Sequence, residues 1–276
     1  SGTEEILPEK ELLQKLERSV RTGKPLRIKQ GFDPTAPDIH LGHAVGLRKL
    51  KQFQDLGHTI VLIVGNYTAL VGDPSGRSAT RPRLSHADIE AYAATYLEQF
   101  FRVLDPVGVE VVRNGDWFAP MNFEQVMELA AGFTIARLLE RDDFEKRFRE
   151  QRPISLHELF YPIMQGHDSV VVRSDVEIGA TEQKFNLLVG RQLQVDSGQE
   201  PQVIMTLPIL VGLDGVNRMS KSLGNYVGIS EPPAQMFGKL MSIPDELLMQ
   251  YYELTTPLSP AEIAGIRQRL ESRQAP

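Results

Sequence analysis

The pattern of apolar and polar positions early in the chain predicts a strand, a helix and a second strand in succession. Apolar residues alternate from Leu26 to Phe32, and the turn that follows is rich in glycine and proline, which end a strand. A helix is expected to begin near His40, because apolar residues recur at helical spacing until Gly57 ends the run. Residues 59–64 are nearly all β-branched or leucine, as in a parallel strand covered on both faces. These segments together indicate a βαβ unit.

The same patterning predicts further elements of an α/β protein. An amphipathic helix is expected at residues 8–20, and another at residues 85–104 with a capping box at its start. Further strands are expected at residues 109–112 and 202–207. Residues 176–183 are expected to lead into a helix. The alternation of helices and strands predicts a parallel sheet between helices.

Residues 114–155 interrupt this alternation and are expected to form an inserted helical segment. Asn122 and Gln125 can cap one of its helices. The charged run at residues 140–152 is expected to be a solvated face. Residues 230–276 are helical by pattern, with prolines and a capping box at helix starts, and are expected to form a short C-terminal helical segment.

Composition narrows the class of protein. With 276 residues, of which 41% are hydrophobic, the chain can build one large core. A net charge of −6 argues against nucleic-acid binding through bulk charge, so any RNA contact requires a local basic patch. The absence of cysteine excludes disulfides and thiol catalysis. Because no apolar run reaches membrane length, we expect no membrane partner and a cytoplasmic location.

Two histidines stand at the predicted start of the first long helix of the βαβ unit. His40 and His43 are three residues apart and share one helix face, where backbone N–H groups favour phosphate. Gly42 between them lets a ligand approach the backbone closely. Ordinary turn histidines are the alternative. A zinc site is a rival that needs further ligands, and the chain offers no cysteine and no nearby histidine cluster, so no metal site is predicted.

Two loops carry cationic side chains suited to phosphates. The long loop after residue 64 is rich in Gly, Pro, Ser and Arg, and its Arg77 and Arg81 can hold phosphates through paired hydrogen bonds. A solvated loop patch is the alternative. The Gly-rich loop at residues 212–226 brings Arg218 and Lys221 close together, as in mobile loops that close over phosphates.

One later helix is expected to present polar side chains to a pocket. It opens at Ser155, and Tyr161, Gln165 and Asp168 are spaced so that they share one face. An exposed polar stripe is the alternative, but the apolar neighbours of these residues indicate a helix that is largely packed. The arrangement therefore suits a small-molecule pocket.

Several segments resemble signatures of the class I aminoacyl-tRNA synthetases. HLGH at residues 40–43 resembles the HIGH signature, and RMSKS at residues 218–222 resembles the KMSKS signature. GDPSGR (72–77), YPIMQGHDS (161–169) and IGATEQKFN (178–186) resemble segments of the tyrosyl branch, bacterial type. The resemblance runs from about Ile6 to Tyr252.

The resemblance implies a Rossmann-like nucleotide-binding fold. The catalytic domain would cover residues 4–229, with the helical insertion at about 114–155 and the RMSKS loop at 218–222. Residues 230–276 would begin a C-terminal helical domain, so the chain is expected to be a catalytic core without the C-terminal RNA-binding domain. In the family the insertion lies at a dimer interface, and a homodimer is therefore expected.

The resemblance also implies a reaction, in which tyrosine and ATP give tyrosyl-adenylate and pyrophosphate and the tyrosyl group then passes to tRNA-Tyr. Attack of a carboxylate on the α-phosphate builds charge on the phosphates, so catalysis is expected to use positioned donors and cations. Mg²⁺ is expected to accompany ATP without a protein site of its own. The expected catalytic residues are His40, His43, Arg77, Arg81 and Lys221. The expected ATP contacts are Gly31, Asp33, Thr35, Gly42, Gly179, Glu182, Arg218, Met219, Ser220 and Ser222.

The contacts to the amino acid follow from the same resemblance. Two carboxylates, Asp33 and Asp73, are expected to hold the α-ammonium group. Gln183 is expected to face the carboxylate and Asp168 to accept a hydrogen bond from the phenol. Phenylalanine would leave an ionised Asp168 buried without that donor and would be rejected. The expected amino-acid contacts are Asn66, Thr68, Asp73, Tyr161, Gln165, Asp168 and Gln183.

The chain departs from the family pattern beside the expected pocket. Asn66 and Tyr67 stand in a segment that reads GDF in the tyrosyl branch that the chain resembles, and His167 replaces the usual tyrosine. Ala180 and Glu182 stand where the family has glycine and aspartate beside the ribose. The added methyl and methylene groups would crowd that position. Altered polar groups in such a site can retune the substrate.

These departures leave alternatives open. Lys29 replaces a tyrosine that touches the phenol in some branches of the family, although the closer branch also has lysine there. A paralogue that activates a modified tyrosine or another aromatic amino acid, and serves something other than a full-length tRNA, is the first alternative. The second is a catalytically silent binding module, which would have no need to keep HLGH, Asp73 and Lys221 together.

Overall fold

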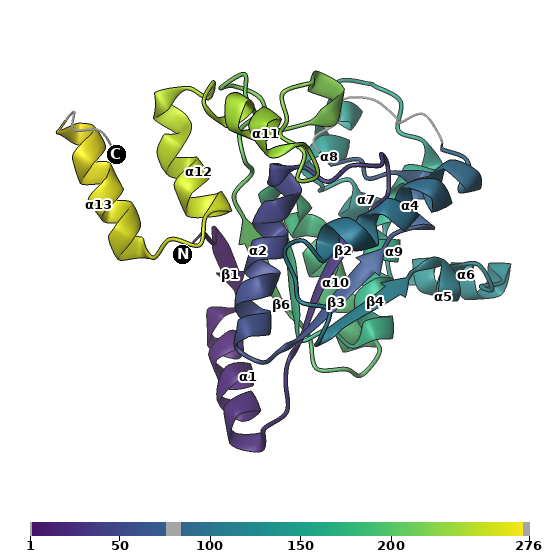
Figure 1. Cartoon of the computed structure of the whole chain (residues 1–276). Coiled ribbons are helices and arrows are strands. Elements are labelled where there is room, and N and C mark those ends of the chain that lie inside the picture. The colour runs from purple at the N-terminus through teal and green to yellow at the C-terminus, as the bar shows by residue number, and fades with distance from the viewer. Residues whose placement is uncertain (1, 76–83, 273–276) are drawn as a thin grey trace.

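A mostly parallel sheet forms the centre of the computed structural model, which describes residues 2–75 and 84–272 (Figure 1). Within these residues the strands are β1 (Glu5–Leu7), β2 (Arg27–Phe32), β3 (Thr59–Val64), β4 (Val109–Arg113), β5 (Val176–Ala180) and β6 (Val203–Leu207). They form one six-stranded sheet in the order β1-β6-β5-β2-β3-β4. β1 is antiparallel to β6, and the other neighbouring strands are parallel.

Helices cover both faces of the sheet, as the apolar strand at residues 59–64 predicts. Ile60 and Leu62 of β3 belong to the large core, whereas Val61 and Ile63 lie in a smaller cluster, because successive side chains of a strand point to opposite faces. The first face is covered by α1 (Glu9–Thr22), α2 (Leu41–Asp55) and α4 (His86–Phe100), and the second by α9 (Phe160–Val172) and α10 (Lys184–Asp196).

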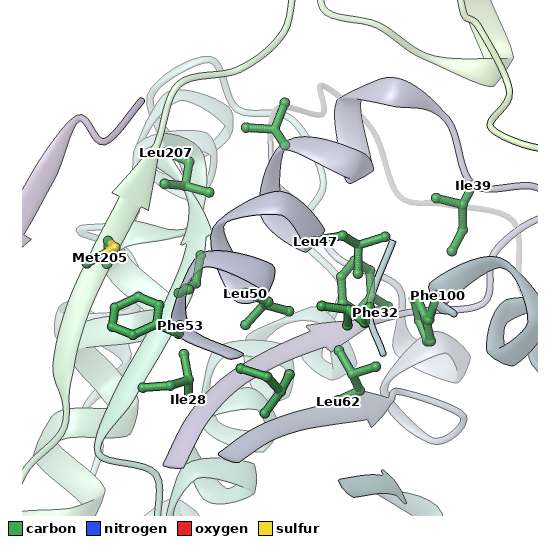
Figure 2. Close-up of a cluster of buried hydrophobic side chains, with 14 of the residues drawn as sticks. Ile28, Phe32, Ile39, Leu47, Leu50, Phe53, Leu62, Phe100, Met205 and Leu207 are labelled. Atoms are coloured by element: carbon green, nitrogen blue, oxygen red, sulfur yellow. The ribbon is translucent and has the colours of Figure 1, made fainter. Parts of the chain in front are cut away.

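Helix α2 is anchored firmly on the first face. Its Leu47, Leu50 and Phe53 pack against the strands beneath, where Ile28 and Leu62 lie (Figure 2). Leu47 and Leu50 are fully buried, with 0% of their surface exposed. Burial of a side chain of this size stabilises the fold by roughly 1.5–3 kcal/mol. The N-terminal end of α2 is thereby fixed at one edge of the sheet.

The order of the strands creates a crevice at the end of β2. The chain passes from β2 outward to β3 and β4, and later builds β5 and β6 on the other side of β2. β2 therefore lies at the point where the strand order reverses. Ligands of open α/β sheets bind at the carboxyl ends of the strands at such a point. The HLGH segment at residues 40–43 follows the end of β2, as predicted.

The predicted strands near residues 26–32, 59–64, 109–112 and 202–207 are confirmed. The prediction at residues 176–183 is confirmed in part, because this segment leads through a 3₁₀ turn into α10, but its first residues form β5, which the prediction does not include. β5 is short and contains a buried glutamate, so its residues lack a clear strand pattern. β1, with three residues, is likewise absent from the prediction.

The helical insertion is present, and α5 and α6 extend beyond the edge of the sheet beside β4 (Figure 1). The expectation that residues 140–152 form a solvated face is wrong in part. Arg141, Phe144 and Arg147 are at most 2% exposed, and Arg147 pairs with Glu158 at 2.6 Å. The helices of this segment are α5 (Gly115–Phe118), α6 (Phe123–Ala131), α7 (Ile135–Leu138) and α8 (Asp142–Arg149).

The C-terminal segment is helical, as predicted, and ends in a helix that Ser259 caps. Within the described residues, no helix combines the length and the apolar character needed to cross a membrane. The remaining helices are α3 (Thr68–Val71), α11 (Pro233–Leu240), α12 (Leu248–Thr255) and α13 (Pro260–Glu271). The 3₁₀ turns are η1 (Leu156–Leu159), η2 (Thr181–Gln183), η3 (Lys221–Leu223) and η4 (Asp245–Leu247).

Candidate active site

A cavity of about 570 Å³ lies at the carboxyl end of β2, where the reversal of strand order predicts a ligand. Its walls come from the start of α2, the turn before α3, one face of α9, the end of β5 and residues 207–222. The predicted site residues that line it are Gly31, Asp33, Thr35, His40, Gly42, His43, Thr68, Asp73, Tyr161, Gln165, Asp168, Gly179, Glu182, Gln183, Arg218, Met219, Ser220, Lys221 and Ser222.

The imidazole rings of His40 and His43 are each held by a hydrogen bond from a backbone N–H group at the start of α2. His40 is the N-cap residue, and its Nδ1 accepts a hydrogen bond from the backbone N–H of Gly42 at 3.1 Å. The Nδ1 atom of His43 accepts from the backbone N–H of His40 at 3.3 Å. An Nδ1 atom that accepts a hydrogen bond carries no proton, so the neutral rings are protonated on Nε2. Both imidazoles therefore present an Nε2–H donor.

Burial keeps both rings uncharged at neutral pH. It lowers the pKa of His40 to about 3, with Lys221 and Arg218 adding to the effect. Burial also lowers the pKa of His43 well below its usual value, with further contributions from His40 and Lys221. The ring centroids are 3.9 Å apart. The pair is therefore suited to stabilise negative charge by hydrogen bonding, without proton exchange.

The RMSKS loop brings cations to the same cavity. The Lys221 ammonium lies 6.0 Å from the centroid of the Tyr96 ring, and burial lowers its pKa to about 8. Arg218 forms two hydrogen bonds of 2.6 Å with the carboxylate of Glu182 at the end of β5. Asn225 holds the loop, because its Oδ1 accepts from the backbone N–H of Ser220 at 2.8 Å. The sequence prediction does not include Asn225.

Asp168 is the most deeply buried acid that lines the cavity. It is 3% exposed and accepts hydrogen bonds from Trp117 Nε1 at 3.0 Å and from Asn114 Nδ2 at 3.3 Å. Burial raises the pKa of Asp168 to about 7, whereas Lys29 and the two donors lower it. Its carboxyl group can therefore exist in either protonation state near neutral pH.

Asn114 and Trp117 are functional candidates that the sequence prediction does not include. Both follow β4 directly, at the same carboxyl edge of the sheet as the cavity. The sequence does contain a signal for these two residues. They follow a predicted strand, and Trp117 is the only tryptophan of the chain.

Asp33 is fixed by hydroxyl groups from two helices. Tyr161 donates to its Oδ2 at 2.8 Å, and Thr68 donates to its Oδ1 at 2.7 Å. Gly65 makes room for this arrangement, because a Cβ atom there would lie 2.1 Å from Asp33 Oδ1. The carboxylate is thus held at the cavity wall.

Asp73 is tied to the helical insertion. Arg141, which is 2% exposed, donates to Asp73 Oδ1 at 3.1 Å, and Gln183 donates to the other oxygen. Gln183 also donates to Ser75 at 2.8 Å, and Asn186 donates to Gln183 at 3.1 Å. The Asp73 carboxylate at the cavity wall is therefore already paired with the guanidinium of Arg141. The expectation of a solvated face at residues 140–152 does not include this pairing.

The structure does not bring every predicted residue to the cavity. Asn66 donates to Glu90 at 2.9 Å and accepts from the backbone of Gly115 at 2.8 Å, and it is not among the lining residues. Its assignment as an amino-acid contact is therefore wrong in this structure. Arg77 and Arg81 lie outside the described residues.

The departures from the family pattern fall into two groups. Tyr67 stacks on Phe118 with ring centroids 5.8 Å apart, and His167 lies 5.6 Å from the same ring. These aromatic residues are not among the lining residues, whereas Ala180 and Glu182 are. Only the second group is therefore placed to touch a ligand directly.

Comparisons with known proteins agree on one family. A family model described as tRNA synthetases class I (W and Y) matches residues 21–275. The tyrosine–tRNA ligase of Moorella thermoacetica is 59% identical over 271 residues, which cover 98% of this chain and 66% of that protein. The corresponding ligase of Geobacter sulfurreducens is 58% identical over 266 residues, or 96% and 66% of the two chains. The chain thus spans 66% of the length of these curated relatives.

Solved structures share the fold. A tyrosyl-tRNA synthetase from Archaeoglobus fulgidus, complexed with L-tyrosine, matches with a TM-score of 0.79 and 22% identity over 100% of this chain and 89% of that chain. A C-terminally truncated mitochondrial tyrosyl-tRNA synthetase from Aspergillus nidulans matches with a TM-score of 0.77 and 21% identity over 98% and 81% of the two chains. These likenesses confirm the predicted Rossmann-like α/β fold.

Proposed function

The chain belongs to the class I tRNA synthetases of the tryptophan and tyrosine type, and on this premise we propose that it activates tyrosine with ATP. The products are tyrosyl-adenylate and pyrophosphate, and the tyrosyl group then passes to tRNA-Tyr. One observation carries the proposal. A single cavity combines neutral histidine donors and a lysine, suited to phosphates, with a buried acid suited to a phenol. We place this reaction in the cytoplasm.

Adenylation requires stabilisation of charge rather than a protein nucleophile. A carboxylate oxygen of tyrosine attacks the α-phosphorus of ATP, a new C(O)O–P bond forms, and the bond from the α-phosphorus to the bridging oxygen of pyrophosphate breaks. Negative charge builds on the phosphate oxygens, which the Nε2–H groups of His40 and His43 and the ammonium of Lys221 can neutralise. Mg²⁺ is expected to enter with ATP and to balance the remaining phosphate charge.

The other half of the cavity fits the amino acid. Asp33 and Asp73 provide negative charge for the α-ammonium, with the Gln165 amide beside them. Gln183 would provide an amide donor for the carboxylate after releasing Asp73 or Ser75, the two acceptors that its N–H groups bond in this structure. Because Arg141 and Gln183 already bond Asp73, binding of the ammonium requires these contacts to rearrange or to be shared. The phenol would donate to Asp168.

The first test is amino-acid-dependent exchange of pyrophosphate into ATP, measured across the twenty amino acids and ring-substituted tyrosines. Tyrosine should support the fastest exchange of the natural set. Faster exchange with a ring-substituted tyrosine would favour the paralogue alternative, for which Ala180 and Glu182 at the cavity wall are the motivation. Absence of exchange with every amino acid would leave the catalytically silent binding module as the remaining alternative.

Lys221 is expected to make adenylation sensitive to alkaline pH. Its ammonium is protonated below a pKa of about 8, and the cation is lost as the pH rises through that value. The rate at saturating tyrosine should therefore fall between about pH 7 and pH 9.5. Lys221→Arg should remove the fall, since a guanidinium stays charged throughout this range. An equal fall in both proteins would contradict the assignment.

We further propose that the chain forms a homodimer through the insertion. Phe123 and Met127 of α6 and Ile135 of α7 are 75%, 52% and 64% exposed, a concentration of apolar surface that a second copy would cover. Sedimentation at about 10 μM should give a dimer of the 30.9 kDa chain, which requires a two-fold interface. Phe123→Glu should give a monomer. Val107→Glu, at an equally exposed position outside the insertion, should not.

A monomer at this concentration in the unmodified chain would contradict the proposal, as would a dimer that Phe123→Glu leaves intact. Both variants change exposed residues, so loss of fold does not complicate the comparison.

A further inference from the structure

An ion pair is buried beneath the cavity, and neither of its residues lines the cavity. Lys29 of β2 and Glu177 of β5 are directly paired residues of neighbouring parallel strands. Their side chains meet at 2.8 Å, and they are 0% and 1% exposed. The Lys29 ammonium also donates to the backbone oxygen of Gln165 at 2.9 Å and to Ser169 Oγ at 2.7 Å.

Stability does not account for this pair. Burial removes two charges from water, and hydrophobic residues of similar volume in place of a buried pair are often neutral or stabilising. All three N–H donors of Lys29 are used within the protein, so it has none to offer a ligand. The departure at Lys29 from a tyrosine that touches the phenol therefore cannot act by replacing that contact.

The pair acts instead on the helix that carries the amino-acid contacts. Gln165 Nε2 donates to Glu177 Oε1 at 3.2 Å, and Gln165 Oε1 accepts from Asn186 at 2.8 Å. These two bonds fix which way the amide of Gln165 points. Its oxygen keeps a second lone pair, which can accept from a bound ammonium group.

The same pair brackets Asp168. Lys29 is bonded to Gln165, three residues before Asp168 along α9, and to Ser169, the residue after it. Lys29 attracts the Asp168 anion, whereas Glu177 repels it. Trp117 and Asn114 face Asp168 from the segment after β4. His167 lies next to Asp168 in α9, and burial lowers its pKa, so it adds no positive charge at neutral pH.

We propose that Lys29 and Glu177 are positioning residues for substrate selection, with Glu177 orienting the Gln165 amide and Lys29 supplying the positive charge beneath Asp168. This inference rests on the proposed activation of tyrosine, because it concerns the same cavity. It assigns the pair to specificity rather than to the chemistry of the phosphates.

Trp117 supplies a readout that does not depend on activity. It is the only tryptophan of the chain, and its indole N–H donates to Asp168 at 3.0 Å, so its fluorescence should change as Asp168 titrates. The pH midpoint in the unmodified chain should be near 7, the pKa of Asp168. Loss of the cation should move this midpoint up, and loss of the Glu177 anion should move it down.

The experiment compares two variants of the full chain. Lys29→Met/Glu177→Met removes both charges and leaves no unpaired ion, and Lys29 has the larger effect of the two on Asp168, so the midpoint should rise. The ratio of kcat/KM for tyrosine over phenylalanine should fall by about 10- to 100-fold. Glu177→Gln keeps the Lys29 cation, and its midpoint should fall. Arg27→Met/Glu110→Met removes a partly exposed ion pair at the start of β2, and this control should match the unmodified chain.

Opposite shifts of the two midpoints, with reduced selectivity in the double variant, would support the inference. Midpoints and selectivity that match the unmodified chain in both variants would overturn it. If the double variant does not fold, the direction of the Glu177→Gln midpoint decides alone. If the unmodified chain shows no tyrosine-dependent exchange, the proposed function fails, and the opposite fluorescence shifts still test the action of the pair on Asp168.

Discussion

Replacement of His43 by alanine is expected to slow adenylate formation by about 100-fold, the loss associated with one preorganised donor in a charge-stabilising site. The Nε2–H of His43 is such a donor, because the backbone of His40 occupies Nδ1 and burial keeps the ring neutral. The donor acts where charge develops in the transition state, so the dissociation constant of tyrosine should stay nearly unchanged.

Single-turnover formation of adenylate, measured beside equilibrium dialysis of tyrosine, separates these two quantities. His86→Ala is the matched control, because His86 is exposed at the start of α4 and should leave the rate unchanged. A loss of tyrosine affinity in His43→Ala as large as the loss of rate would remove His43 from the phosphate half of the reaction.

Replacement of Asp168 by asparagine is expected to reduce the preference for tyrosine over phenylalanine by about 10- to 100-fold, the value of one hydrogen bond to a charged group. Trp117 and Asn114 bond different oxygens of Asp168, so asparagine keeps an acceptor for only one of these donors, and it cannot ionise. The presence of these donors also corrects the expectation that phenylalanine leaves Asp168 without a partner. Discrimination against phenylalanine therefore comes from the additional hydrogen bond that the phenol of tyrosine donates to the Asp168 carboxylate, which already accepts from Trp117 and Asn114.

The preference for tyrosine should also depend on pH. The pKa of Asp168 is raised to about 7, so the carboxyl is largely protonated at pH 6 and largely ionised at pH 8. An ionised carboxylate accepts the phenol proton more strongly. The ratio of kcat/KM for the two amino acids should thus rise from pH 6 to pH 8.

The Asp168→Asn variant should show no such rise, and Asp116→Asn, at an exposed position nearby, should behave like the unmodified chain. If Asp168→Asn leaves the ratio of kcat/KM for tyrosine over phenylalanine unchanged at every pH, Asp168 is excluded as the residue that recognises the phenol.

The buried parts of the sheet are predictable from sequence because their pattern is local. β3 is almost wholly apolar, and α2 shows its leucines at helical spacing, so each segment specifies its own structure. β5 contains Glu177, whose burial depends on Lys29 from another strand. No local pattern can report a partner that distant, and the strand is therefore absent from the prediction.

The site shows the same division. Tyr161, Gln165 and Asp168 are correctly placed on one face by helical spacing alone. Arg141 lies in a run of charges that is normally solvated, and only its contact with Asp73 explains its burial. Asn66 fails for the opposite reason, because the direction of a side chain in the turn after β3 is set by Gly115 and Glu90.

The ratio of kcat/KM for tyrosine over phenylalanine in pyrophosphate exchange, at pH 8, tests whether this cavity selects tyrosine by its phenol. Sites built to hydrogen-bond a substrate hydroxyl reject the analogue without it by roughly 10⁴- to 10⁵-fold, and tyrosyl-tRNA synthetases are themselves the established example of this magnitude. We expect a ratio in that range. A ratio below about 10, the discrimination that a difference in apolar contact alone can supply, would contradict the assignment of this cavity to tyrosine.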